Sequence, residues 1–348
     1  MKFSVITLGC KVNAYESESY VESMIQAGFE HVNPKEKADI YIVNSCAVTN
    51  AAALKTRQQI SRSHRINEKA MIVVIGCYAQ IESELLMENE MISLLIGSNK
   101  KGQLVPLIKQ VLAGEDVSGV DVKERNFDYE DLGVTSFSNN QRAFLKVQDG
   151  CDQFCSYCII PFARGKERSL DLNKVLSHAN FFINEGHKEI VLSGIHTGRY
   201  GSDINSDLYT LMKTLLNKEQ QLQRLRVSSI EILEINDDII ALAKQNKRIA
   251  NHWHIPLQSG CDKTLESMNR RYTTAQYTER VNIIRENLKN VAISADVIVG
   301  FPGESERDFE ETYEYIKGLD LAFLHVFPYS PKNNTRASYM KEQVPGDV

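Results

Sequence analysis

Three cysteines stand close together near the middle of the chain, at Cys151, Cys155 and Cys158. The spacing C-x3-C-x2-C places three thiols within eight residues, and soft thiolates this close together can hold one compact metal centre. Three protein ligands rather than four leave one metal position open, which distinguishes reactive from structural metal sites. We therefore expect a reactive metal centre on this segment.

Zinc is the main alternative for this trio. Zinc sites usually show two C-x2-C pairs or nearby histidine partners, and the sequence contains no second cysteine pair. The spacing resembles the signature of the radical S-adenosylmethionine superfamily. That resemblance implies a 4Fe–4S cluster whose fourth iron binds S-adenosylmethionine, which is then cleaved to a 5′-deoxyadenosyl radical.

Three further cysteines each follow an apolar, strand-like segment. Cys10 follows residues 3–8, Cys46 follows 39–43 and Cys77 follows 71–75. Because the carboxyl ends of parallel strands meet at one edge of a sheet, we expect these cysteines to form a second metal site there. A buried core cysteine is the alternative for each of them taken alone.

The elements around these cysteines alternate between strand and helix patterns, which favours a parallel α/β sheet. The expected helices are 13–27, 50–64, 81–88 and 103–113, with a further short strand at 94–96. Residues 114–141 hold seven acidic against two basic residues and are typical of a linker. We therefore expect an N-terminal cysteine domain over 1–113, an acidic linker over 114–141 and a second domain over 142–348.

The second domain repeats the alternation six times, which predicts a partial (β/α)6 barrel with its chemistry at the carboxyl ends of the strands. The expected strands are 143–147, 189–192, 226–229, 252–257, 292–299 and 322–327. The expected helices are 173–185, 208–217, 237–244, 263–269, 274–287 and 306–319.

Composition limits the class of protein. A chain of 348 residues suggests about two domains, and 43% apolar with 24% charged residues is ordinary for a globular protein. The net charge of −5 gives no general affinity for nucleic acid, so RNA would need a local basic patch. We find no signal peptide and no apolar run near the ~20 residues of a membrane span. We therefore expect a cytoplasmic protein whose cysteines are metal ligands.

With both trios placed, the chain resembles the methylthiotransferases over nearly its whole length. Gly9-Cys10-Lys11-Val12-Asn13, followed by Tyr15-Glu16-Ser17, resembles the branch that modifies N6-threonylcarbamoyladenosine next to the anticodon in tRNA. The branch acting on isopentenyladenosine typically has Gly-Cys-Gln-Met-Asn there, and the branch acting on a ribosomal protein aspartate has Gly-Cys-Pro-Lys-Asn. Those two substrates, a non-catalytic iron–sulfur scaffold and a zinc-stabilised α/β protein remain alternatives.

The resemblance also implies roles for residues. It assigns an auxiliary 4Fe–4S cluster to Cys10, Cys46 and Cys77, and the radical-generating cluster to Cys151, Cys155 and Cys158. It implies one S-adenosylmethionine as methyl donor and one as radical source, with tRNA and a reductase such as flavodoxin or ferredoxin as partners and no membrane. The candidate cofactor contacts are Tyr157, Ser193, Gly194, Glu231, Gln258 and Ser259, and for each of them a structural role is equally open.

The remaining features have two interpretations each. Arg164 and Arg168 either meet a cofactor carboxylate or RNA phosphate, or form a solvated pair. The basic residues of 51–70 either form an RNA-binding face or are simply solvated; they are Lys55, Arg57, Arg62, Arg65 and Lys69. We interpret Cys261 as a helix-start or core cysteine. The family normally continues into a C-terminal TRAM domain; because the sequence ends at Val348, we expect either a shortened chain or one without that domain.

Overall fold

The structure is a computed structural model that describes residues 1–117, 128–133 and 141–346. Its contacts divide the chain into two compact units. The first comprises 1–140, 149–152 and 159–170, and the second comprises 141–148, 153–158 and 171–348. Among the helices of the described ranges, none is both long and apolar enough to cross a membrane.

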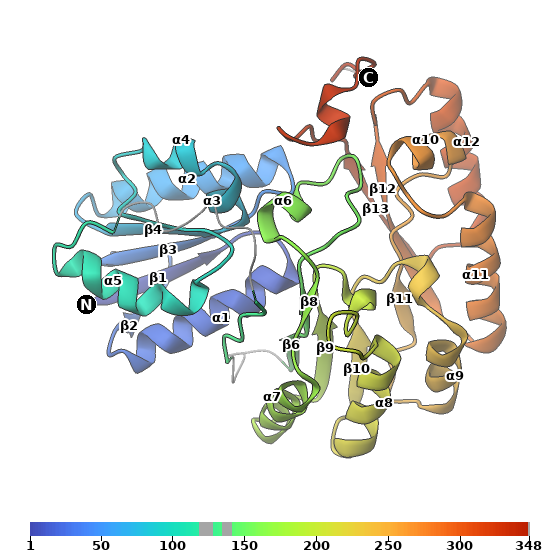
Figure 1. Cartoon of the computed structure of the whole chain (residues 1–348), viewed down its shortest axis with the longest axis horizontal. Helices are drawn as coiled ribbons and strands as arrows, with labels where there is room; N and C mark the ends of the chain where they lie inside the picture. The colour runs from blue at the N-terminus through green and yellow to red at the C-terminus, as the bar shows by residue number, and fades with distance from the viewer. Residues whose placement is uncertain (118–127, 134–140, 347–348) are drawn as a thin grey trace. The chain divides into compact units, whose positions relative to one another are not determined.

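A five-stranded parallel sheet forms the centre of the first unit (Figure 1). Its strand order is β2-β1-β3-β4-β5. The strands are β1 (Lys2–Thr7), β2 (Glu30–His31), β3 (Ile40–Ser45), β4 (Met71–Gly76) and β5 (Leu94–Ile96). Every residue of β3 and β4 is buried, as expected for the central strands of a sheet covered on both faces.

Helices cover both faces of this sheet. They are α1 (Lys11–Gln26), α2 (Asn50–Ile66), α3 (Cys77–Ile81), α4 (Ser83–Met87), α5 (Leu104–Leu112) and α6 (Ile160–Arg164). Val74 packs in one core cluster with Ile60 of α2, and its neighbour Ile75 packs in the other with Met24 of α1. Successive residues of the strand thus face opposite helical layers. Ala163 of α6 belongs to the first of these clusters.

Six parallel strands form the sheet of the second unit. They are β6 (Arg142–Lys146), β9 (Glu189–Ser193), β10 (Arg224–Val227), β11 (His252–His254), β12 (Ala292–Val299) and β13 (Phe323–Pro328). Ladders join β10-β9-β6 and β11-β12-β13, and single bridges, such as that from Ser229 to His254, connect the two groups. This order confirms the predicted partial (β/α)6 barrel.

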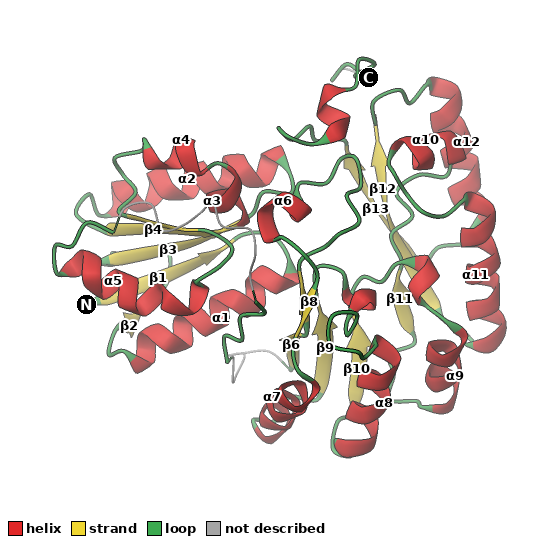
Figure 2. Cartoon of the chain, in the orientation of Figure 1, coloured by secondary structure: helices red, strands yellow, loops and turns green. Residues whose placement is uncertain are grey.

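The helices of this unit lie along one side of its strands (Figure 2). They are α7 (Leu172–Asn184), α8 (Leu208–Lys218), α9 (Asp237–Gln245), α10 (Asp262–Ser267), α11 (Thr274–Asn287) and α12 (Glu306–Gly318). Two short strands, β7 (Gln148–Asp149) and β8 (Arg168–Ser169), pair separately.

Several predicted elements differ from the structure. The helix expected over 81–88 is two short helices, and the first of them already begins at Cys77. The strand expected over 252–257 ends at His254, because Pro256 has no N–H to donate and Gln258 has a left-handed φ of 67°. Of the acidic segment, 118–127 and 134–140 lie outside the described residues, while Leu132 packs against the core of the first unit.

Candidate functional site

Three of the predicted ligands lie at one edge of the first sheet. Strands β1, β3 and β4 are neighbours, and a cysteine follows the carboxyl end of each: Cys10, Cys46 and Cys77. Ser45 pairs with Gly76 in the ladder, so the next two residues, Cys46 and Cys77, leave neighbouring strands at the same level. These two cysteines are buried, whereas Cys10 is exposed.

The three thiols lie within electrostatic range of one another. Burial raises the pKa of the Cys46 thiol to about 12, and the charges of Cys77 and Cys10 contribute to this rise. A thiolate at this position therefore needs a positive charge beside it, and a bound metal supplies one.

Gly9 permits the first two cysteine loops to approach each other. Its φ is 102°, and a Cβ placed on it would lie 2.7 Å from the Cβ and 2.8 Å from the Sγ of Cys46. Glycine alone combines this conformation with the missing side chain. The glycine that precedes Cys10 is therefore required by the position of Cys46.

Two buried asparagines fix the strand ends that carry the cysteines. Asn13 Nδ2 donates to the carbonyl oxygens of Leu8 at 2.7 Å and Ser45 at 3.1 Å. Asn44 Nδ2 donates to the carbonyl oxygen of Asn13 at 2.9 Å. The Ser45 hydroxyl donates to the carbonyl oxygen of Ile75 at 2.7 Å. Hydrogen bonds thus connect the ends of all three strands, which positions their cysteines relative to one another.

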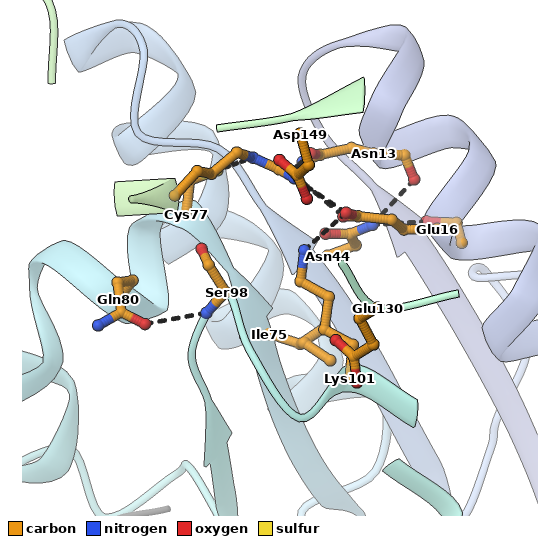
Figure 3. Close-up of polar contacts among 12 residues, drawn as sticks. Asn13, Glu16, Asn44, Ile75, Cys77, Gln80, Ser98, Lys101, Glu130 and Asp149 are labelled. Carbon is orange, nitrogen blue, oxygen red and sulfur yellow. Dashed lines mark hydrogen bonds and ion pairs between the residues drawn. The ribbon is translucent and has the colours of Figure 1, made fainter. Parts of the chain in front are cut away.

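Arg164 reaches this edge, although it follows the other cysteine trio in sequence. Its side chain is fully buried, and its Nε donates to the Sγ of Cys77 at 3.1 Å. Both Nη atoms donate to the Glu16 carboxylate, at 2.9 and 3.2 Å. They also donate to Asp149 Oδ1 at 3.1 Å and Asn13 Oδ1 at 2.9 Å. All five N–H groups of the guanidinium therefore have acceptors, and Figure 3 shows the labelled partners converging.

Both sequence-based interpretations of Arg164 are wrong, because a guanidinium buried in this way is not solvated and has no N–H left for a phosphate or a cofactor carboxylate. Arg168 is buried as well. It donates to the carbonyl oxygens of Arg164 at 2.6 Å and Lys166 at 3.0 Å. It also forms a 3.2 Å ion pair with Asp149. The two arginines fasten the segment after the cluster loop to the first unit.

A second buried cation belongs to this network. Lys101 Nζ lies 2.6 Å from Glu16 Oε1, and both side chains are almost inaccessible to solvent. Desolvation opposes the charge on Arg164, but the charges of Cys77, Glu16 and Asp149 outweigh it and raise the pKa of Arg164 well above its ordinary value. Arg164 therefore stays charged beside Cys77, within a network of buried ion pairs.

Cys151, the first cysteine of the second trio, belongs to the first unit, while Cys155 and Cys158 belong to the second. The N–H of Cys151 donates to the carbonyl oxygen of Gly165 at 3.0 Å. The preceding Gly150 has a φ of 74°, and a Cβ on it would lie 1.9 Å from the Lys166 carbonyl oxygen. The chain before the trio is therefore in direct backbone contact with the segment that follows it.

The rest of the cluster loop is anchored on the end of α10. The N–H of Ser156 donates to the carbonyl oxygen of Met268 at 3.0 Å. The Ser156 hydroxyl donates to the carbonyl oxygen of Ser267 at 2.8 Å. The Asn269 amide donates to the carbonyl oxygen of Phe154 at 3.0 Å. One turn of chain therefore holds the residues on either side of Cys155.

Arg270 contacts a thiol of this loop directly. One Nη donates to the Sγ of Cys155 at 3.4 Å, and the other forms an ion pair with Glu231. Desolvation opposes its charge, but Glu231 and its other neighbours outweigh that effect and raise the pKa of Arg270 well above its ordinary value. The predicted cofactor contact Glu231 is thus engaged by an arginine at the cluster loop.

Tyr157, another predicted contact, packs edge-on against Phe301 with ring centroids 6.5 Å apart. Burial raises the pKa of its phenol well above the ordinary value. Tyr157 therefore stays neutral and offers an apolar ring with one polar end.

The remaining predicted contacts differ in how free their polar groups are. The Ser259 hydroxyl is buried 3.1 Å from that of Thr312, and the Ser193 carbonyl accepts the N–H of Val147 at 2.9 Å. A Cβ on Gly194 would lie 2.9 Å from Gln148 Oε1. Gln258 combines its left-handed φ with a side chain that makes no hydrogen bond among the described residues. It is therefore the most available of the six for a ligand.

Two other groups of side chains are accounted for within the fold. His254, Asp296 and His325, on three neighbouring strands, bring their ligand atoms within 4.8 Å of one another. His254 Nε2 lies 3.0 Å from Asp296 Oδ2, and its Nδ1 lies 2.9 Å from the Ser294 hydroxyl, so both ring nitrogens of His254 have partners within the fold. Cys261, as predicted, is buried and precedes the first residue of α10.

The basic residues after Cys46 are all exposed, as both interpretations of them require. Four lie on α2, while Lys69 lies beyond the end of that helix at Ile66. Arg57 donates to the Tyr78 hydroxyl at 2.8 Å, next to Cys77. This contact brings one of the basic side chains near the cysteine edge.

The donor sets fit iron–sulfur clusters. Each trio offers three cysteines that are free of disulfides, soft ligands that suit iron–sulfur clusters. In each trio an arginine donates to one of the thiols, which is the hydrogen bonding that stabilises cluster sulfurs.

The sequence did not lead us to Glu16 and Lys101 as parts of the site. The one available signal was that Glu16 follows Asn13 by three residues, which puts two polar residues on the buried face of α1.

Comparison with known families and proteins adds a second line of evidence. Residues 2–97 match the family described as "Uncharacterized protein family UPF0004", and residues 145–316 match the Radical SAM superfamily. The chain is 40% identical over 344 residues to the threonylcarbamoyladenosine tRNA methylthiotransferase MtaB of Bacillus subtilis, covering 98% of this chain and 76% of that protein.

More distant similarities agree on the fold. The chain is 31% identical to a tRNA-2-methylthio-N(6)-dimethylallyladenosine synthase of Finegoldia magna, covering 99% of this chain and 76% of that protein. Among solved structures, it superposes with a TM-score of 0.69 on the radical S-adenosylmethionine methyltransferase TsrM of Kitasatospora setae. That match covers 95% of this chain and 76% of the other at 14% identity.

Proposed function

The chain belongs to the threonylcarbamoyladenosine tRNA methylthiotransferases, and from that membership we propose how its own residues serve the reaction. The enzyme adds a methylthio group to carbon 2 of N6-threonylcarbamoyladenosine next to the anticodon in tRNA. One S-adenosylmethionine is the methyl donor and a second is the radical source. Its cofactors are two 4Fe–4S clusters and S-adenosylmethionine.

We assign the auxiliary cluster to Cys10, Cys46 and Cys77. The observation that carries the proposal is their position: three free thiols at the carboxyl ends of the adjacent strands β1, β3 and β4, where parallel sheets bind their ligands. Gly9 leaves the space that brings the first two loops together. Asn13 holds the ends of β1 and β3.

We assign the radical-generating cluster to Cys151, Cys155 and Cys158. When bound, this cluster and S-adenosylmethionine supply a carbon-centred radical, which can act on an adenine C–H bond that no side-chain base can deprotonate. The chain itself holds the loop in place through Ser156 and Asn269.

For S-adenosylmethionine, the proposed contacts are Tyr157, Ser193, Gly194, Glu231, Gln258 and Ser259. Gln258 has the strongest support, because its backbone is strained and its side chain makes no hydrogen bond within the part of the chain that the structure describes. Ser259 has the weakest, since its hydroxyl is already used in the core.

The proposal extends to partners and place. The enzyme acts on tRNA and requires a reductant; we propose flavodoxin or ferredoxin as the electron donor, the exposed basic residues after Cys46 as an RNA contact, and the cytoplasm as the location. Residues 1–113, 114–141 and 142–348 remain our proposed domain, linker and barrel boundaries.

The test uses the full chain, reconstituted anaerobically with iron and sulfide. It is incubated with S-adenosylmethionine, dithionite and tRNA that carries threonylcarbamoyladenosine, and the nucleosides are analysed by mass spectrometry. We expect the methylthio product, and we expect Cys261→Ala, a matched cysteine outside both trios, to give the same yield.

Other outcomes would redirect the proposal. Product from isopentenyladenosine tRNA or from a ribosomal protein, with none from this tRNA, would assign another substrate. Two clusters by iron and sulfide analysis without any cleavage of S-adenosylmethionine would indicate a scaffold protein. Zinc in place of iron would indicate a structural site.

A further inference from the structure

We propose that Arg164 is a positioning residue of the auxiliary cluster, which donates its Nε–H to the sulfur of Cys77 and stabilises the negative charge that the cluster gains on reduction. The proposal rests on the proposed function, because Cys77 must be a cluster ligand. Arg164 lies 87 residues from Cys77 in the chain, yet the Nε–Sγ distance is 3.1 Å.

The direction of this hydrogen bond is fixed by the rest of the guanidinium. Glu16 accepts from both Nη atoms, at 2.9 and 3.2 Å, a bidentate arrangement that sets the plane of the group. Asn13 and Asp149 accept the remaining two N–H groups. Since a planar guanidinium cannot reorient one N–H alone, these partners leave the Nε–H directed at Cys77.

The partners of Arg164 also connect it to the other ligands of the trio. Asn13 Oδ1 lies 3.7 Å from the Sγ of Cys10, and Asn13 Nδ2 holds the Ser45 carbonyl, one residue before Cys46. Arg164 therefore contacts one thiol of the trio directly and is hydrogen-bonded to Asn13, the residue that positions the other two. Its burial removes the solvent screening that would weaken its charge.

These contacts predict an effect on redox behaviour. Hydrogen bonds to the sulfurs and nearby charge set the reduction potential of an iron–sulfur cluster. A buried donor with a full positive charge favours the reduced, more negative form, so it raises the potential. Glu16 has the opposite sign, and its carboxylate lowers the potential by opposing the charge of Arg164.

The experiment isolates the auxiliary cluster. The full chain with Cys151, Cys155 and Cys158 all changed to Ala is reconstituted anaerobically, and iron, sulfide and the reduction midpoint are measured, the midpoint by titration followed by electron paramagnetic resonance. Two further substitutions are made separately in this triple variant. Arg164→Lys keeps the positive charge but removes the planar guanidinium with its Nε–H, and Glu16→Gln removes the carboxylate charge. Arg168→Lys is the matched control, since Arg168 shares the partner Asp149 but donates to the backbone carbonyl oxygens of Arg164 and Lys166.

We expect Arg164→Lys to lower the midpoint by at least 59 mV, a tenfold change in a one-electron equilibrium, and Glu16→Gln to raise it, with Arg168→Lys unchanged. An unchanged midpoint in a cluster-loaded Arg164→Lys variant, or a midpoint of Glu16→Gln that stays or falls, would overturn the proposal. If Arg164→Lys does not fold, the direction of the Glu16→Gln shift decides. Absence of iron in the parent variant would instead contradict the ligand assignment itself.

Discussion

The two cysteine trios are built in opposite ways. Cys151, Cys155 and Cys158 lie within one short loop, so the covalent chain keeps their thiols close and a few hydrogen bonds from the end of α10 orient them. Cys10, Cys46 and Cys77 are distant in sequence and meet only because β1, β3 and β4 are neighbours in a sheet. The first arrangement depends on local chain geometry and the second on the whole fold of its unit, so damage to the fold should affect them unequally.

The most direct test of this contrast removes one ligand from each trio. We expect Cys151→Ala to abolish formation of 5′-deoxyadenosine, because the radical source loses a ligand. Cys46→Ala should keep that cleavage but give no methylthio product, since only the auxiliary cluster is lost. Chromatography of both products checks this, and equal loss of cleavage in the two variants would contradict the division of roles.

Breaking the buried Lys101–Glu16 ion pair, near the sheet edge that carries Cys10, Cys46 and Cys77, should have the next largest effect. Lys101→Met leaves Glu16 with Arg164 as its cation, so we expect a loss of about 3 kcal/mol in unfolding free energy, the lower end for a broken buried pair. The measurement is the urea unfolding of the cluster-free protein. Lys317→Met is the control, because its pair with Glu314 is well exposed and should contribute less than about 1 kcal/mol. Equal losses would show that the network does not support the edge.

Substitutions at two glycines, Gly9 and Gly28, can separate the effect of backbone strain from the effect of crowding Cys46. Gly9 and Gly28 have φ of 102° and 90°, but a Cβ meets Cys46 only at Gly9, and at Gly28 it meets nothing within 4 Å. We expect both alanine variants to lose roughly 1 kcal/mol through strain. Only Gly9→Ala should also lose about half of the bound iron on reconstitution. Full iron content in Gly9→Ala would mean that the first two loops can separate without cost to the auxiliary site.

The smallest effect is expected at the other trio. Asn269→Gly keeps the left-handed conformation (φ 59°) but removes the hydrogen bond to Phe154, worth about 1 kcal/mol. We expect a two- to tenfold slower formation of 5′-deoxyadenosine, with unchanged iron at the auxiliary edge. Asn290→Gly, at φ 56° and exposed, is the matched control. A similar slowing in the control would assign the effect to general flexibility.

The same contrast decides what the sequence could reveal. The spacing of Cys151, Cys155 and Cys158 is visible directly, and Cys10, Cys46 and Cys77 become visible once each is seen to follow an apolar strand. The contacts of Arg164 with Cys77 and of Lys101 with Glu16 join residues 87 and 85 apart. No periodicity or local spacing encodes them, because they depend on where α6 packs, and α6 itself was not predicted.

Element boundaries failed where backbone chemistry overrode the apolar pattern. The residues of 255–257 are as apolar as a strand, yet Pro256 and the left-handed Gln258 end β11 early. The helix predicted over 81–88 was placed too late because Cys77 itself begins a helix immediately after β4. Both deviations lie at the carboxyl ends of strands, which are the positions that carry the proposed ligands.

The assignment of residues 159–170 to the first unit has a consequence for biosynthesis. A ribosome releases the chain from its amino end, so the five strands of that unit emerge well before Ile159 and Ala163, which complete one of its cores. The first unit therefore cannot complete its folding until translation has passed Leu170. Until then one hydrophobic core is unfinished, and the Glu16–Lys101 ion pair lacks its contact with Arg164. A single proteolytic cut after Leu170 would keep all of the first unit on one fragment but would remove residues 141–148 and 153–158 from the second.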